Sequence, residues 1–193
     1  MKKEMKLLII TALIILIILI FVATSKTNHT EKQILSAYDE IFEIQKEVDI
    51  EIEQYKNDSQ YTMETPKIML NPYKLAPLTA LIIFKTPDEV DIEVKVNNTK
   101  MTTMEKSTEH VIPIYGMYAD YENEIELIAS NGKNKKLNIK TDEYDGDPIT
   151  LEKTSEEVKN NLYFISPNFV NNCIIDGNGN ILWYIKRRLC RRY

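Results

Sequence analysis

The sequence predicts a mainly β protein in which a transmembrane helix and an amphipathic helix precede an immunoglobulin-like β-sandwich. Three observations predict this order: an apolar run follows the first lysines, an apolar stripe of helical period follows that run, and from residue 66 apolar residues alternate at every second position. With 193 residues, 44% hydrophobic and 27% charged, the chain has the composition of a globular protein of one or two small domains.

Residues 1–25 are expected to form a signal anchor. Lys2, Lys3 and Lys6 precede a segment, residues 7–23, whose one polar residue is Thr11. As a helix this segment is about 25 Å long, near the short end of a membrane span. Because positive residues stay inside, we expect a single-pass protein of the cell membrane whose residues from about 24 onward are extracellular or periplasmic. Cleavage near Ala23, as in a signal peptide, is the alternative.

Residues 28–57 are expected to form the amphipathic helix. Neither Pro nor Gly occurs between residues 31 and 55, and one stripe recurs at alternate steps of four and three residues: Ile34, Tyr38, Ile41, Gln45, Val48, Ile52 and Tyr55. The stripe favours packing on the downstream domain, because Gln45 interrupts it. A parallel homodimer through a heptad seam stays open as the alternative.

Residues 66–142 are expected to be the immunoglobulin-like domain. Residues 90–96 alternate between valine or isoleucine and charged side chains, as in a strand with one face on a core, and residues 79–84 suit a strand covered on both faces. Residues 124–129 and 137–140 flank Asn131-Gly132, which predicts a hairpin with a type I′ turn. Pro113 predicts an edge strand, and Tyr118 or Tyr121 is a candidate tyrosine-corner residue.

A polar connection with a short helix at residues 155–160 is expected next, followed by a hairpin of residues 173–176 and 181–185. The segment Asp176–Asn180 (DGNGN) begins like a calcium loop, but Ile181 and Arg187 stand where that loop requires Gly and Glu, so we interpret it as a turn.

No catalytic, cofactor-binding or metal-ligating residue is predicted. His29 and His110 lack identifiable catalytic partners, and Cys173 and Cys190, which could pair outside the cytosol, have no histidine nearby to complete a zinc site. The chain carries a net charge of −5 and its central part is acidic, so we expect no nucleic-acid partner.

Three segments resemble a known family. They are Asn71–Leu81 (NPYKLAPLTAL), His110–Asn123 (HVIPIYGMYADYEN) and Ile175–Tyr184 (IDGNGNILWY). The first two are similar to the signatures of the N-terminal domain of bacterial aryl-sulfate sulfotransferases. The third is similar to the Asp-x-x-Gly-x-x-x-Trp-Tyr segment with which the propeller of that family begins, so residues 163–185 are expected to be a fragment of a propeller blade.

The resemblance implies sulfuryl transfer from a phenolic sulfate ester to a phenol, without a cofactor, through a nucleophilic histidine in the propeller of an intact relative. No residue of this chain matches that histidine. The basic tail, residues 186–193, is interpreted as the product of a frameshift or early stop, so the chain is expected to be truncated and inactive. A membrane-anchored extracellular β-sandwich for binding or adhesion, without catalysis, is the alternative function.

Overall fold

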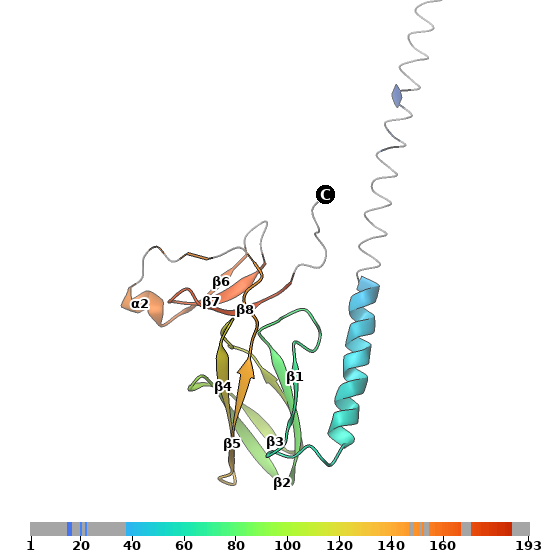
Figure 1. The fold of residues 1–193 in the computed structure, drawn as a ribbon, viewed down its shortest axis with the longest axis vertical. Coiled ribbons are helices and arrows are strands. Elements are labelled where there is room, and N and C mark those ends of the chain that lie inside the picture. Colours follow the sequence, from blue (N-terminus) through green and yellow to red (C-terminus); the bar gives the residue numbers. More distant parts are fainter. Residues whose placement is uncertain are drawn as a thin grey trace, which may run out of the picture. The chain divides into compact units, whose positions relative to one another are not determined.

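The computed structural model describes residues 15–16, 20, 22, 38–146, 149–150, 152, 155–166 and 171–186. The chain is mainly β, as predicted, and divides into two units, Met1–Glu43 with Arg191–Tyr193 and Ile44–Cys190 (Figure 1). In the first unit, Ile15, Leu16, Ile20 and Val22 are helical and exposed, as are several residues of the helical segment 38–43. Over the described residues, no helix is long and apolar enough to cross a membrane. Most of the predicted anchor, and residues 28–37 of the predicted amphipathic helix, lie outside that part of the chain.

In the second unit, residues 44–57 are helical and pack on the domain that follows them. Val48 is buried, the Tyr73 hydroxyl donates to Asp49 Oδ1 over 3.3 Å, and Lys67 Nζ lies 4.4 Å from the centroid of the Tyr55 ring. Val48 and Tyr55 belong to the stripe that the sequence indicated, and Asp49 lies next to it, so this part of the helix is held by its own chain.

Five strands form one antiparallel sheet: β1 (Lys67–Leu70), β2 (Ala80–Val96), β3 (Thr99–Ile114), β4 (Glu122–Ala129) and β5 (Asn134–Lys140). β3 runs along one edge of β2, while the other edge of β2 pairs first with β1 and further on with β4. The expected sandwich of separate sheets is therefore one curled sheet. Three register shifts, the first between Lys85 and Val90, allow the long β2–β3 pair to bend, because bulges increase local twist.

One core fills the inside of the curled sheet. It contains Ile82, Phe84, Ile92, Ile125 and Leu127, all essentially inaccessible to solvent. Ile83, between two of these residues, is also fully buried but points to the opposite face, because successive strand residues alternate. The prediction that residues 79–84 are covered on both faces is thus confirmed at Ile83, whereas Thr79 and Leu81 on the same face are partly exposed.

The turn at Asn131-Gly132 differs from the prediction, and the predicted turn type occurs elsewhere in the chain. Gly132 has a positive φ of 87° but Asn131 does not, and Ala129 N donates to Lys133 O, so the loop has three residues. A three-residue loop of this kind is a type I turn followed by a left-handed residue, so the type I′ prediction is wrong here. The two successive positive φ angles typical of type I′ occur instead at Asn97 and Asn98, between β2 and β3.

A second sheet follows in the order β6 (Leu162–Ile165), β7 (Cys173–Asp176) and β8 (Ile181–Tyr184). The short helix α2 (Glu156–Lys159) precedes it, with Ser155 as N-cap, and both this helix and the β7–β8 hairpin lie where the sequence predicts them. β6 adds a strand that the sequence pattern did not reveal.

Candidate functional site

The two sheets meet in a small second core. Leu78, from the loop before β2, is fully buried with Cys173, Ile175 and Tyr184 of the second sheet. The Tyr144 ring contacts the Tyr184 ring edge to face, with centroids 4.8 Å apart. Burial, together with the nearby Asp145 carboxylate, raises the pKa of the Tyr184 hydroxyl. Because Leu78 belongs to the curled-sheet domain, this core connects that domain directly to the second sheet.

A main-chain hydrogen bond and an ion pair add to this junction. Lys186 N donates to Leu75 O over 2.8 Å, and the Lys186 ammonium pairs with the Asp145 carboxylate at 2.7 Å. Cys173 is buried, and burial raises the pKa of its thiol, so it packs as an apolar residue rather than acting as a nucleophile. Cys190 lies outside the described residues, and the suggested Cys173–Cys190 disulfide stays untested.

The turn between β7 and β8 is organised by Asp176. Its Oδ1 accepts the main-chain N–H groups of Asn178 and Asn180, both at 2.9 Å, and its Oδ2 accepts the Asn180 amide at 2.9 Å. Burial alone would raise the pKa of this carboxyl, but the hydrogen bonds from Asn180 and Asn178 outweigh it and lower the pKa. These hydrogen bonds make the segment a turn, as the sequence predicts. Across the described residues, no group of three or more His, Cys, Asp or Glu side chains could hold a metal ion.

A mainly apolar groove lies beside this turn, with a volume of about 1010 Å³. Its apolar lining comes from both sheets: Met101, Tyr115, Leu162, Phe164, Leu182 and Trp183. Strand alternation explains it, because Cys173 and Ile175 point into the second core whereas Ile174, between them, lines the groove. Leu162 and Phe164 are 66% and 64% exposed, which is unusual for two neighbouring apolar side chains of one strand face.

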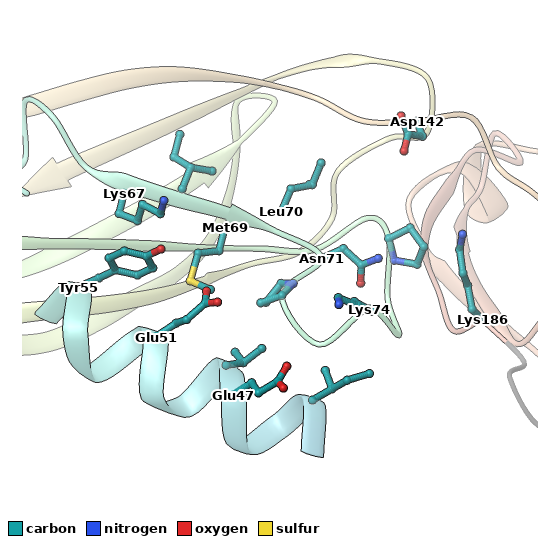
Figure 2. A pocket seen from close by; sticks show the side chains of 15 residues that line it. Glu47, Glu51, Tyr55, Lys67, Met69, Leu70, Asn71, Lys74, Asp142 and Lys186 are labelled. Atoms are coloured by element: carbon teal, nitrogen blue, oxygen red, sulfur yellow. The ribbon is translucent and has the colours of Figure 1, made fainter. Parts of the chain in front are cut away.

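A charged cleft of about 520 Å³ lies between the helical residues 44–57 and β1 with its following loop (Figure 2). Glu47 and Glu51 line it from the helix, and Lys67, Lys74 and Lys186 line it from the other side. Opposite charges on opposing walls favour contact between the helix and the domain. The cleft has no nucleophile next to a general base, so its geometry does not indicate catalysis.

His110, one of the two histidines, is part of the first core. Its Nε2 lies 3.0 Å from Thr86 Oγ1, and that hydroxyl donates to Asp88 O over 2.9 Å, so Nε2 carries the proton and donates to Thr86. The ring stacks on Phe84 at 4.7 Å, and burial lowers the pKa of the imidazole. His110 therefore has a structural position, while His29 lies outside the described residues.

The corner before β4 is built around Asn123, which sequence reasoning did not identify. This fully buried amide accepts from Tyr118 N at 2.8 Å and donates to Tyr118 O and Tyr121 O, both at 3.1 Å, and to Thr141 Oγ1 at 3.2 Å. The tyrosines contribute main-chain atoms to this corner, whereas the Tyr118 hydroxyl reaches Asp176. The alternation of β4 could have identified it, because Asn123 lies on the same buried face of the strand as Ile125 and Leu127.

Comparison with known families identifies the first of the two sheets. A family described as the arylsulfotransferase Ig-like domain matches residues 67–144, which span β1 to β5 and the first residues after β5. A search of curated proteins finds no significant match. The matched range contains Leu78, His110 and Asn123, and it nearly coincides with residues 66–142 as expected from the sequence. Residues 67–144 of this chain are therefore an arylsulfotransferase Ig-like domain.

Proposed function

We propose that this Ig-like domain acts as the supporting N-terminal domain of an aryl-sulfate sulfotransferase. The observation that carries the proposal is the second core, in which Leu78 of the family-matched domain is buried among Cys173, Ile175 and Tyr184 of the next sheet. A sheet must bury its apolar face against another element, so this short three-stranded sheet gains stability by packing on the Ig-like domain. Support of the following β-structure is the role that this packing favours.

We further propose that the chain described here does not transfer sulfuryl groups. The related enzymes, as the sequence resemblance implies, use a nucleophilic histidine in the propeller. His110 is a poor candidate for that role, because it is buried and its Nε2 donates to Thr86. A nucleophilic imidazole needs a free nitrogen lone pair that the substrate can reach.

An assay of the full chain with nitrophenyl sulfate as donor and phenol as acceptor tests this second proposal. We expect nitrophenol release no faster than in buffer. Saturable turnover would contradict the proposal, and the His110→Phe variant would then show whether this imidazole takes part.

We also propose that residues 1–25 anchor the protein and that the Ig-like domain lies outside the cytoplasm. The support is the apolar segment after Lys2, Lys3 and Lys6. A reporter enzyme that matures only outside the cytoplasm, fused after residue 193, should be active. An inactive reporter together with an active cytoplasmic reporter at the same position would contradict this topology.

A further inference from the structure

The free edge of β1 borders the charged cleft. β1 lies at the end of its sheet, and among the described residues it pairs with β2 alone. All four consecutive residues of Lys67–Leu70 line the cleft (Figure 2). Because successive side chains of a strand point to opposite faces, four residues in a row border one cavity along the edge of the strand rather than on one face. The main-chain groups that β2 does not bind are therefore directed into the cleft.

The helix on the other wall of the cleft carries negative charge that the described residues leave uncompensated. Glu47 and Glu51 both line the cleft and lie one helical turn apart, so their carboxylates share one side of the helix. Neither carboxylate forms an ion pair or a hydrogen bond with another described residue. On the opposite wall, Lys186 pairs with a different carboxylate and Lys67 lies over an aromatic ring. A basic segment between the walls would compensate the two glutamates.

The chain itself supplies such a segment. Figure 2 shows Lys186 at the end of the cleft opposite to Lys67. The four residues that follow are Arg187, Arg188, Leu189 and Cys190. This basic segment, residues 187–190, has a net charge of +2, whereas the helical residues 44–57 contain four carboxylates and two lysines and have a net charge of −2. Because the segment follows a residue that already lines the cleft, it meets the helix at a high effective concentration.

The dimensions of the basic segment and the cleft agree. Four residues of extended chain span about 13 Å, which is the length of β1, since β1 also has four residues. Alternate residues of a strand lie about 6.7 Å apart, and the rise along the helix from Glu47 to Glu51 is about 6 Å. An extended segment can therefore lie beside both carboxylates.

We propose that the basic segment pairs antiparallel with β1 in the charged cleft and ties the helix to the Ig-like domain. The direction follows from the position of Lys186, because a chain that enters at the end of β1 runs back towards Lys67 (Figure 2). Side-chain alternation directs either Arg187 or Arg188 towards the helix, where a guanidinium can bind a carboxylate with two hydrogen bonds. This inference goes beyond the supporting role proposed above and does not depend on it.

Disulfide formation in the full chain, kept in mild detergent, tests this placement. The antiparallel direction places Cys190 beside Lys67, so Lys67→Cys should form a disulfide with Cys190 within one chain under a mild oxidant, as seen by peptide mapping without reduction. Lys135→Cys is the matched control and should not react, because Lys135 is likewise a half-buried lysine of a strand but does not line the cleft. Cys173 is buried and should stay reduced.

The rate of this disulfide formation also tests the contribution of charge. Glu47→Lys combined with Glu51→Lys should slow the reaction about fivefold or more, because attraction to the arginines is replaced by repulsion. Adding Arg187→Glu and Arg188→Glu should restore the rate, since the charges are then exchanged between the two sides.

Glu105→Lys combined with Glu122→Lys is the matched control for charge and should leave the rate unchanged. These two glutamates are exposed and lie outside the cleft, and the change in net charge is the same. A covalent dimer in place of a link within one chain, equal reaction of Lys67→Cys and Lys135→Cys, or a rate that does not follow the charge exchange would each overturn the proposal.

Hydrogen exchange provides an independent readout in case a cysteine variant fails to fold. Arg187→Glu combined with Arg188→Glu leaves every described residue in place, and the amides of β1 should then exchange about threefold faster or more, because its outer edge loses its partner. Equal exchange of β1 in this variant and in the wild type would overturn the proposal as well.

Discussion

Gly177→Ala tests the close contact between the β7–β8 turn and α2. The contact predicts that the substitution lowers the free energy of unfolding, whereas without the contact the substitution would raise it. An alanine Cβ at this position would lie 2.0 Å from Val158 O and 2.4 Å from Lys159 Cα, both main-chain atoms of α2. The turn itself does not require glycine here, because φ at Gly177 is not positive and the equivalent position of the Ala129–Lys133 turn is Ser130. The close approach of α2 is therefore the reason for glycine at position 177.

The magnitude follows from these distances. Non-bonded carbon and oxygen atoms prefer a separation of about 3.5 Å, so α2 must move by roughly 1.5 Å to accommodate Gly177→Ala. Overpacking of this kind costs about 1–3 kcal/mol. Without the contact with α2, the same substitution would stabilise the protein by about 0.4–1 kcal/mol, because alanine restricts the unfolded chain.

Urea denaturation followed by the fluorescence of Trp183, the single tryptophan, measures this change next to the turn. Hydrogen exchange of residues 155–161 should also become faster in the variant, since α2 is displaced. Gly132→Ala is the control, because its φ of 87° strains an alanine while no atom lies within 4 Å of the added Cβ. A Gly177→Ala protein that is more stable than the wild type, with unchanged exchange in residues 155–161, would refute the reasoning.

Three further predictions concern the Ig-like domain. Because burial lowers the pKa of His110 in the folded state, unfolding exposes a group that binds protons more readily, so stability should fall as the pH drops below about 6.5, by up to about 1.4 kcal/mol per pH unit. Urea titrations at several pH values should show this slope, and His110→Gln should remove it; an equal slope in the variant would assign it to other groups. Asn123→Ala removes the acceptor of Tyr118 N and one donor each from Tyr118 O and Tyr121 O, and should cost about 2–4 kcal/mol in the same assay, whereas a cost below about 0.5 kcal/mol would contradict its central position. Asn98→Ala, at a φ of 66°, should cost about 1–2 kcal/mol and Asn98→Gly almost nothing; equal costs would argue against the type I′ turn.

Alternation of apolar residues predicted most of the strands, because it reports which side chains face a core. The strand at residues 90–96, the hairpin of β4 and β5, and the edge position of the Pro113 strand are all confirmed. The continuity of β2 was not predictable from the same pattern. Pro87 and Asp88 resemble a break, yet the hydrogen bond from Thr86 Oγ1 to Asp88 O holds them within a bulge of a 17-residue strand.

The turn at Asn131 was predictable from information that the dipeptide alone does not contain. Ile125 lies opposite Leu137, and this pairing of apolar side chains requires an odd number of loop residues. A two-residue loop would have placed Ile125 opposite Asn138. Register therefore prevails over the preference of Asn-Gly for type I′, because burial of the apolar face contributes more free energy than the turn.

The junction between the two sheets could not be predicted, since it depends on contacts between residues distant in sequence. Leu78 and Tyr184 are separated by more than a hundred positions, and no local pattern shows that they share a core. The sequence also does not predict which face of β6 is exposed, because alternation over four residues does not tell which face is covered.

Hydrogen exchange of two matched variants, Leu78→Ala and Leu127→Ala, tests the supporting role most directly. Both leucines are fully buried, Leu78 in the second core and Leu127 in the first, and each substitution should cost about 2–5 kcal/mol. We predict that Leu78→Ala accelerates exchange in β6, β7 and β8 while residues 67–144 keep their protection, and that Leu127→Ala accelerates exchange in both sheets. Full protection of the second sheet in Leu78→Ala, or its survival when Leu127→Ala opens the Ig-like domain, would contradict a supporting role.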